Sequence, residues 1–190
     1  MNTPAHIVIN LAVLGRKDKP ENNIPIAIGA FLPDLPMFLF YAYEKLWQKT
    51  PEWTIWSESY YNPSWQDFFD IFNSIPLVAI AGLMAYYFGS GRLVALFASM
   101  GLHSIGDFPV HNDDAHRHFF PFSSWRFESP FSYWDYNHHG RIVSFLEVVA
   151  VIVCCIIICR RQPSVKSYLL TGSAIAMYVI YWGYAVLTWG

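Results

Sequence analysis

The chain has 190 residues, of which 54% are hydrophobic and only 14% are charged, and its formal net charge is −2. A soluble domain carries about 25% charged residues, so this chain has too little charge for a surface that faces water on all sides. The abundant apolar surface excludes a disordered chain, and the slightly acidic balance argues against nucleic acid as a partner, because phosphate contacts require a basic face.

Apolar segments long enough to cross a membrane follow one another along the chain. A spanning helix requires about 20 mostly apolar residues, so the first run, 4–15, is too short to cross alone and is expected as a half-helix inside a bundle. The segment 24–46 is long enough, but Pro33 and Pro36 flank Asp34 and remove backbone donors, which predicts a break there. The remaining predicted spans are 70–89, 92–110, 140–159 and 167–189.

These segments predict an all-α fold: a multipass transmembrane helical bundle of about five spanning helices plus the N-terminal half-helix, forming one integral membrane domain over 1–190. Two stretches rich in Trp, Tyr, Phe and Pro, 44–69 and 111–139, are expected as loops at the membrane interface. If the helices alternate, the short connections on one side carry seven basic residues: Arg16, Lys17, Lys19, Arg92, Arg160, Arg161 and Lys166. The positive-inside rule makes that side cytoplasmic, so both long loops face outward from a plasma or inner membrane.

Five ionisable residues fall at one predicted depth, from the middle of the bilayer into its outward half, when the chain is counted at ~1.5 Å per helical residue. They are His6, Asp34, His103, Asp107 and Glu147. His103 and Asp107 are four residues apart and so share a helix face, where an imidazole nitrogen and a carboxylate can reach one divalent ion. Placing an ionisable side chain inside a membrane costs free energy, so each of these residues is a candidate functional residue.

The segment after this helix is rich in histidine and adds further candidate ligands. His111 continues the four-residue spacing, and His138 or His139 would turn inward to the same layer, whereas His116 and His118 are expected to be solvated. Structural interpretations stay open beside the metal hypothesis. His6 could be an interfacial cap, His103 and Asp107 a structural hydrogen-bonded pair, Asp34 the cap of a half-helix, and Glu147 a structural partner.

The segments TPAHIVIN, GAFLPDLP and GLHSIGDFPVH resemble the inner-membrane-associated metal-dependent hydrolases, a family distantly similar to zinc-dependent phospholipase C and the single-strand-specific zinc nucleases. The resemblance covers roughly residues 1–140 and implies a phospholipase C-like core. It assigns metal ligation to His6, Asp34, His103 and Asp107, with His111 as a match for the histidine that follows. Here no histidine lies between positions 7 and 102, and Ile142 and Val143 stand where a late His-x-x-x-Glu would place its Glu, so the expectation is one or two ions, zinc first.

The resulting functional expectation is a membrane-embedded metal-dependent hydrolase that acts on a phosphoester, with a membrane lipid as the substrate suggested by the depth of the site. Asp34 is the expected bridging ligand or base, and His111 the expected proton donor. Arg117 and Arg126 could pair with a phosphate. Two other classes stay open: a divalent-metal or proton transport protein, because intramembrane His, Asp and Glu also mark transport routes, and a non-catalytic membrane scaffold that docks partners on its aromatic loops.

Overall fold

A computed structural model describes residues 1–189 of the chain, with side chains for 1–180 and 183. The regular secondary structure of this part of the chain is helical, without a β-strand, as the apolar segments predict. The helices, in chain order, are α1 (Thr3–Leu14), α2 (Asn23–Phe31), α3 (Leu35–Ala42), α4 (Glu52–Ser57), α5 (Pro63–Asn73), α6 (Ile75–Tyr87), α7 (Gly91–Asp107), α8 (Gly140–Arg161) and α9 (Val165–Trp189).

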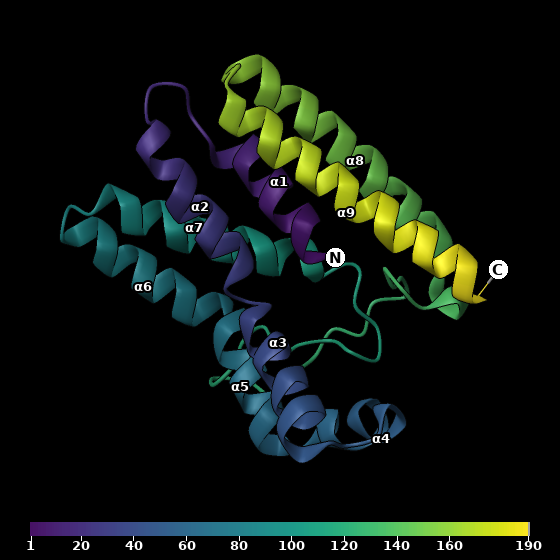
Figure 1. The fold of residues 1–190 in the computed structure, drawn as a ribbon. Helices are drawn as coiled ribbons and strands as arrows, with labels where there is room; N and C mark the ends of the chain where they lie inside the picture. Colours follow the sequence, from purple (N-terminus) through teal and green to yellow (C-terminus); the bar gives the residue numbers. More distant parts are fainter. Residues whose placement is uncertain (190) are drawn as a thin grey trace.

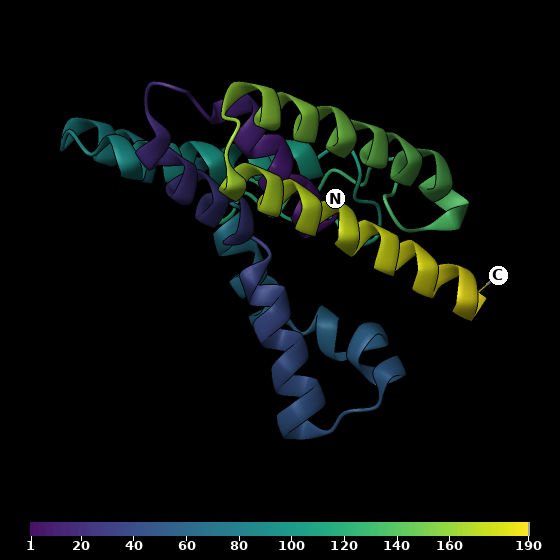
Figure 2. The same ribbon diagram turned by 45° about the horizontal axis from the view of Figure 1, so that its top comes forward.

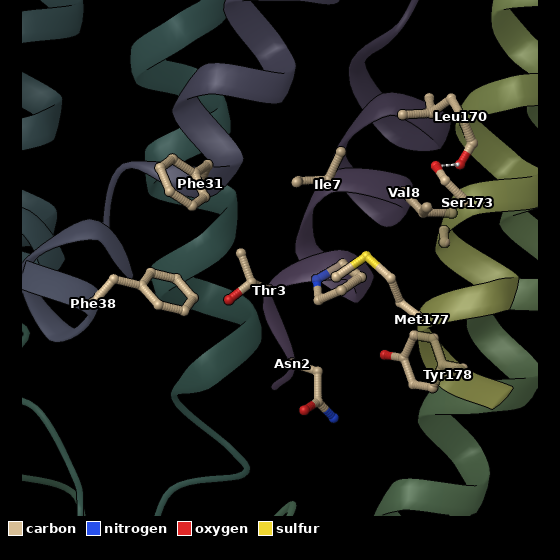
Figure 3. Close-up of a pocket in the computed structure, with 12 residues that line it drawn as sticks. Asn2, Thr3, Ile7, Val8, Phe31, Phe38, Leu170, Ser173, Met177 and Tyr178 are labelled. Carbon is tan, nitrogen blue, oxygen red and sulfur yellow. Dashed lines mark hydrogen bonds between the residues drawn. The ribbon is translucent and has the colours of Figure 1, made fainter. Parts of the chain in front are cut away.

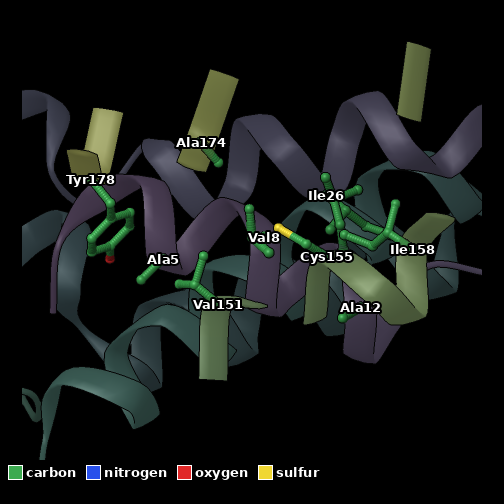
Figure 4. Close-up of a cluster of buried hydrophobic side chains, with 10 residues drawn as sticks. Ala5, Val8, Ala12, Ile26, Val151, Cys155, Ile158, Ala174 and Tyr178 are labelled. Carbon is green, nitrogen blue, oxygen red and sulfur yellow. The ribbon is translucent and has the colours of Figure 1, made fainter. Parts of the chain in front are cut away.

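Helix α1 lies in the centre, with α2 and α7 on one side and α8 and α9 on the other (Figure 1). Ala5, Val8 and Ala12 recur at intervals of three and four residues, so they share one face of α1, and all three are buried. Figure 4 shows them among Val151 of α8 and Ala174 of α9. Small side chains at these positions let the helices approach closely, which makes the short α1 the core element rather than a surface one.

Helices α2 and α7 approach each other backbone to backbone at Gly29, and polar groups connect both helices to α1. A Cβ atom added to Gly29 would lie 2.2 Å from the Leu96 carbonyl oxygen, so only glycine permits this approach. The buried Asn10 amide donates to the carbonyl and the hydroxyl of Ser99, each at 2.8 Å. The Ser99 hydroxyl in turn donates to the Ile26 carbonyl at 2.6 Å. These bonds set the register in which α1 meets the C-terminal half of α7.

The predicted break around Asp34 is confirmed. Helix α2 ends at Phe31, α3 begins at Leu35, and the two directions differ by 50°. Pro36 lies at the start of α3, where its missing N–H costs no helical hydrogen bond. The bend turns the Asp34 carboxylate toward α1 instead of leaving it along a continuous helix.

A second break contradicts the expectation of one helix over 70–89. The chain bends by 42° between α5 and α6, because Pro76 lies in the first turn of a new helix rather than inside an old one. Ser74 caps that helix by accepting a hydrogen bond from the Leu77 amide at 3.2 Å. Its hydroxyl also donates to the Phe120 carbonyl at 2.5 Å, which joins the bend to the segment after α7.

Among the described residues, α8 is the one helix long and apolar enough to cross a membrane, and the count rises to three if each bent pair forms a single span. One flank of α8 is covered with exposed apolar side chains, among them Ile142, Phe145, Leu146, Val149, Ile152, Val153, Ile156 and Ile157. This surface is compatible with association with a membrane. The expected bundle of about five spans is therefore supported only as far as an all-helical fold with one to three candidate spans.

The segment 44–69 is not the loop that its composition suggested. It contains a π-helical turn over Tyr43–Gln48, then α4, a 3₁₀ turn over Ser59–Tyr61 and the start of α5. These elements project from the rest of the molecule together with α3 (Figure 2). They enclose a small core of their own around Phe40, Ile55, Tyr60 and Phe69. Part of the aromatic composition is therefore explained by packing rather than by a membrane interface.

The segment 111–139 is irregular, as expected, and folds back over the end of α7. Ser129 donates its backbone N–H to the His111 carbonyl at 2.9 Å, and Tyr133 donates to the Val110 carbonyl at 3.0 Å. The Ile75 amide donates to the His118 carbonyl at 2.9 Å. These bonds hold the histidine-rich segment between α6 and the end of α7, so several of its side chains reach the interior.

Candidate metal centre

Three residues from two helices converge at the centre of the fold. His6 comes from α1, and His103 and Asp107 come from successive turns of α7. Both imidazole Nε2 atoms lie 2.9 Å from the Asp107 carboxylate, one on each oxygen. The two rings stack with centroids 3.5 Å apart. The structure thus brings together three of the five ionisable residues expected at one depth. All three side chains are buried, so their desolvation requires compensation.

The hydrogen bonds around this group leave nitrogen lone pairs without partners. The His103 Nδ1 lies 2.8 Å from the Ala30 carbonyl oxygen and must donate to it, so Nε2 of the neutral ring carries the lone pair. That Nε2 and the Nδ1 of His6 are both buried and without a hydrogen bond. Orphaned buried polar atoms call for an explanation, and a carbonyl that holds the far side of a histidine is the usual support of a metal ligand.

A divalent metal ion fits these residues. His6, His103 and Asp107 each offer one ligand atom, and the three atoms lie within 4.8 Å of one another. Two imidazoles and one carboxylate form a donor set typical of a catalytic zinc site, which keeps a further position open. The group could therefore hold a metal ion, and the donor types are compatible with several transition metals.

Asp34 lies at the edge of this group. One of its oxygens is 3.5 Å from the His103 Nε2, and the other accepts a hydrogen bond from the Thr3 hydroxyl at 2.6 Å. The alternative that Asp34 caps the following helix does not hold, because its side chain makes no capping bond at the start of α3. Its carboxylate is a quarter exposed and faces a cavity, which leaves it accessible to a substrate.

His111 continues the row of side chains at the end of α7. Its Nε2 lies 3.3 Å from the Asp107 carboxylate, and its Nδ1 lies 2.9 Å from the carboxylate of Asp114. Burial alone would lower the pKa of His111, but the negative charge of Asp107 and the contacts of the ring with the Asp107 and Asp114 carboxylates raise it to about 9. The α-amino group of Met1 also donates to Asp107 and lies 3.3 Å from the His111 Nε2.

A polar cavity of about 220 Å³ opens beside the three-residue group. Its wall contains Asp34, His111, Asp114, His116 and Tyr133. This volume is large enough for a phosphoryl group and water, and it is too small for a polymer. The cavity meets the buried group through Asp34, 3.5 Å from the His103 Nε2, and through His111, 3.3 Å from the Asp107 carboxylate.

A second, apolar cavity of about 420 Å³ adjoins the polar one, and both are lined by Asn2, Thr3 and Phe38. It lies between the start of α1, the α2–α3 bend and α9 (Figure 3). Phe31 on one side and Met177 on the other give it hydrocarbon walls. A molecule that reached both cavities would place a polar group near Asp34 and an apolar group against α9.

Three predicted ligands lie elsewhere. Glu147 is buried, but it accepts hydrogen bonds from the backbone and side-chain amides of Asn2 and from the Tyr178 hydroxyl, which is the structural interpretation left open by the sequence. His138 bonds to Asp135 at 2.5 Å before α8. His139, which is exposed with a φ of 63°, begins that helix. The structure brings none of the three to the group of His6, His103 and Asp107.

The two arginines expected to meet a phosphate are engaged within the protein. Arg117 donates to Asp70 and, at 2.5 Å, to Asp67. Arg126 donates to the Ala115 carbonyl at 2.8 Å and to the Gln66 amide oxygen at 2.9 Å. Both side chains tie the segment 111–139 to α5, and neither lines the polar cavity.

The expectation that His116 and His118 are solvated is wrong. Their exposed fractions are 9% and 3%, because the segment folds back over α5 and α7. His116 lies 3.5 Å from the Asp70 carboxylate and reaches the wall of the polar cavity. His118 lies 3.2 Å from the Asn73 carbonyl and packs against the ring of Phe108.

The buried His118 predicts an acid-sensitive fold. Burial, reinforced by the neighbouring His116, lowers the pKa of His118 to about 4. An unfolded histidine titrates near 6.5, so between these values the unfolded chain binds a proton that the folded chain does not. The free energy of unfolding therefore has its full value above about pH 6.5, and it falls by up to about 3 kcal/mol as the pH approaches 4.

Denaturant unfolding in detergent, followed by near-ultraviolet circular dichroism between pH 4.5 and 7.5, measures this slope. His118→Gln should flatten it, whereas His139→Gln, at an exposed position, should leave it unchanged. Equal slopes in the wild type and His118→Gln would refute the assignment.

Sequence reasoning missed three groups near the centre: the Met1 amine, Thr3 and Asp114. A search for side-chain motifs does not include a terminal amine. Nothing in the sequence distinguishes Thr3 from other threonines, and only the structure shows its hydroxyl donating to Asp34. Asp114 lies three residues after His111, and in a helix this spacing would place the two side chains on one face. Outside a helix the same spacing does not predict which way either side chain points.

No protein-family model, no curated protein and no solved structure matches this chain.

Proposed function

We propose that this protein is a membrane-associated, metal-dependent hydrolase that cleaves a phosphoester, with a lipid as its substrate. The observation that carries the proposal is the buried group of His6, His103 and Asp107 beside a polar cavity whose wall bears Asp34 and His111. The resemblance of the segments around His6, Asp34 and His103 to the membrane-associated hydrolases supports the same chemistry.

His6, His103 and Asp107 would hold the ion, and zinc is the first candidate because this donor set suits it. When bound, a divalent ion at this position polarises a phosphoryl oxygen and makes a water molecule more acidic. The Ala30 carbonyl holds His103 in the tautomer that ligation requires. Asp34 lies 3.5 Å from the His103 Nε2, at the edge of this ligand group.

The other side chains at the cavity transfer protons and orient one another. Asp34 faces the cavity as a carboxylate held by Thr3 and accepts the proton of the attacking water. The water oxygen forms a bond to phosphorus, and the bond from phosphorus to the leaving oxygen breaks. His111, oriented by Asp114, donates a proton to that leaving oxygen. Protonated His111 is the form that this task requires.

The apolar cavity supports an amphiphilic substrate. The apolar cavity has hydrocarbon walls (Figure 3) and shares residues with the polar cavity. An acyl chain could therefore lie against α9 while a phosphate reached Asp34 in the polar cavity. The proposal places the chain as a multipass protein in a plasma or inner membrane, with the basic connections in the cytoplasm and the site in the outward half.

The test is hydrolysis by zinc-loaded protein in detergent, with a short-chain phospholipid and bis(p-nitrophenyl) phosphate as substrates. Asp34→Asn should lower kcat by about 10²- to 10⁴-fold while the content of bound metal stays the same. Asp18→Asn, which removes an exposed carboxylate paired with Arg16 at the other end of α1, is the matched control. No turnover by the wild type above that of Asp34→Asn would refute the proposal.

A further inference from the structure

A cavity of about 510 Å³ has an unusual wall of aromatic rings and carboxylates. Trp56, Tyr60 and Tyr61 line it from the α4–α5 region, and Tyr133 and Trp134 line it from the segment that follows α7. Asp113 and Asp114 complete it. The proposed hydrolysis uses neither Asp113 nor the tryptophans, and the aromatic stretch 53–65 is only partly explained by the small core beneath it.

We infer that this cavity binds an organic ammonium group. Faces of tryptophan and tyrosine attract a cation through the ring quadrupole, and several of them together form the usual receptor for alkylated ammonium ions. Trp56, Tyr61 and Trp134 are 43%, 50% and 52% exposed, so the rings are accessible. A site for an apolar ligand would not require carboxylates in its wall, and a site for a metal ion would not require aromatic rings. The combination of both favours an organic cation.

The carboxylates of the cavity carry the complementary charge. Asp114 accepts a hydrogen bond from the Trp134 indole at 3.1 Å, and its carboxylate lies 2.9 Å from the His111 Nδ1. Burial and the nearby charge of Asp114 raise the pKa of Asp113, so a bound cation would stabilise the ionised pair. The neighbouring cation, Arg126, is held by the Ala115 carbonyl and Gln66 and does not line the cavity.

Ligand-detected NMR with full-length protein in detergent tests the inference without any requirement for hydrolysis. Choline is the probe, and 3,3-dimethylbutan-1-ol, which has the same shape without the charge, is the comparison. Choline should bind at least about tenfold more tightly than the neutral alcohol. Equal binding of the two would overturn the inference.

Variants locate the binding to this cavity. Trp134→Ala and Tyr61→Ala, both at half-exposed positions, should each weaken choline binding by about tenfold, and Asp113→Asn should weaken it while preserving the shape of the wall. Trp53→Ala, at an 80% exposed position outside the cavity, is the matched control and should leave binding unchanged. Wild-type affinity in both Trp134→Ala and Asp113→Asn would place the binding elsewhere and refute the assignment.

A further arm distinguishes the source of the ammonium group. A lysolipid with a trimethylammonium headgroup should bind more tightly than choline if the natural ligand is a lipid, and no more tightly if it is a free amine. In both cases the same lysolipid with a glycerol headgroup should bind more weakly than the trimethylammonium form. A glycerol form that binds as tightly would overturn the inference, and this outcome is independent of whether any phosphoester is cleaved.

Discussion

Replacement of Asp107 by asparagine is expected to abolish metal binding. One carboxylate lies 2.9 Å from the Nε2 atoms of both His6 and His103, so its replacement removes one of the three ligands and the negative charge of the group. We expect the apparent Kd for zinc to rise by more than about 100-fold. His103→Ala should have a similar effect, because its Nε2 is the best-defined free lone pair in the group.

Elemental analysis of protein purified in detergent measures the effect directly. The wild type and Asp18→Asn should carry about one equivalent of transition metal or more, and Asp107→Asn and His103→Ala should carry little. Removal of the metal from the wild type by a chelator should lower its Tm, because an ion that binds only the folded state stabilises it. Wild-type protein with less than about half an equivalent, unchanged in both variants, would contradict the metal centre.

Substitution of alanine for Gly29 is expected to be the most damaging change outside the metal centre. The new Cβ atom would lie 2.2 Å from the Leu96 carbonyl oxygen and 2.9 Å from the Ser99 Cβ, and the backbone on both sides leaves little space for a shift. Overpacking of this kind costs about 3 kcal/mol. Because the neighbouring Ala30 carbonyl holds His103, separation of α2 from α7 should also weaken metal binding.

Gly82→Ala is the matched control. Its Cβ atom would lie 3.5 Å from the Phe97 Cβ, an ordinary van der Waals contact in the neighbouring α6–α7 interface. Thermal unfolding in detergent should show a lower Tm for Gly29→Ala and little change for Gly82→Ala. Equal Tm values for the two variants would mean that the α2–α7 approach is not as close as the structure has it.

The elements predicted most accurately from the sequence are those with strong local signals. The apolar run at 140–159 corresponds to α8, and the proline pair around Asp34 corresponds to the bend between α2 and α3. Pro76 also indicates a break between helices, but the continuous apolar character of 70–89 favoured the prediction of a single helix there. In 44–69, aromatic residues were taken for an interface because composition alone does not distinguish rings that pack on one another from rings that face lipid.

For the site, sequence reasoning was strongest where spacing along a helix constrains direction. His103 and Asp107, four residues apart, must share a face, and counting along the segments placed His6 and Asp34 near them. The same counting placed Glu147 at that depth, but depth does not determine the direction in which a side chain points around a helix. Glu147 instead holds Asn2 at the start of α1.

By itself, the sequence determined a helical chain, the break around Asp34 and the residue types from which a metal centre could be built, because apolar segment length, proline and residue chemistry are local properties. Only the tertiary structure decided which of these residues meet. The crossing of α2 and α7 at Gly29 and the hydrogen bonds of Asn10 set the register that brings His6 beside His103. The return of 111–139 over α7 buries His116 and leaves His139 outside, because long-range packing, rather than local composition, decides which polar groups lose their water.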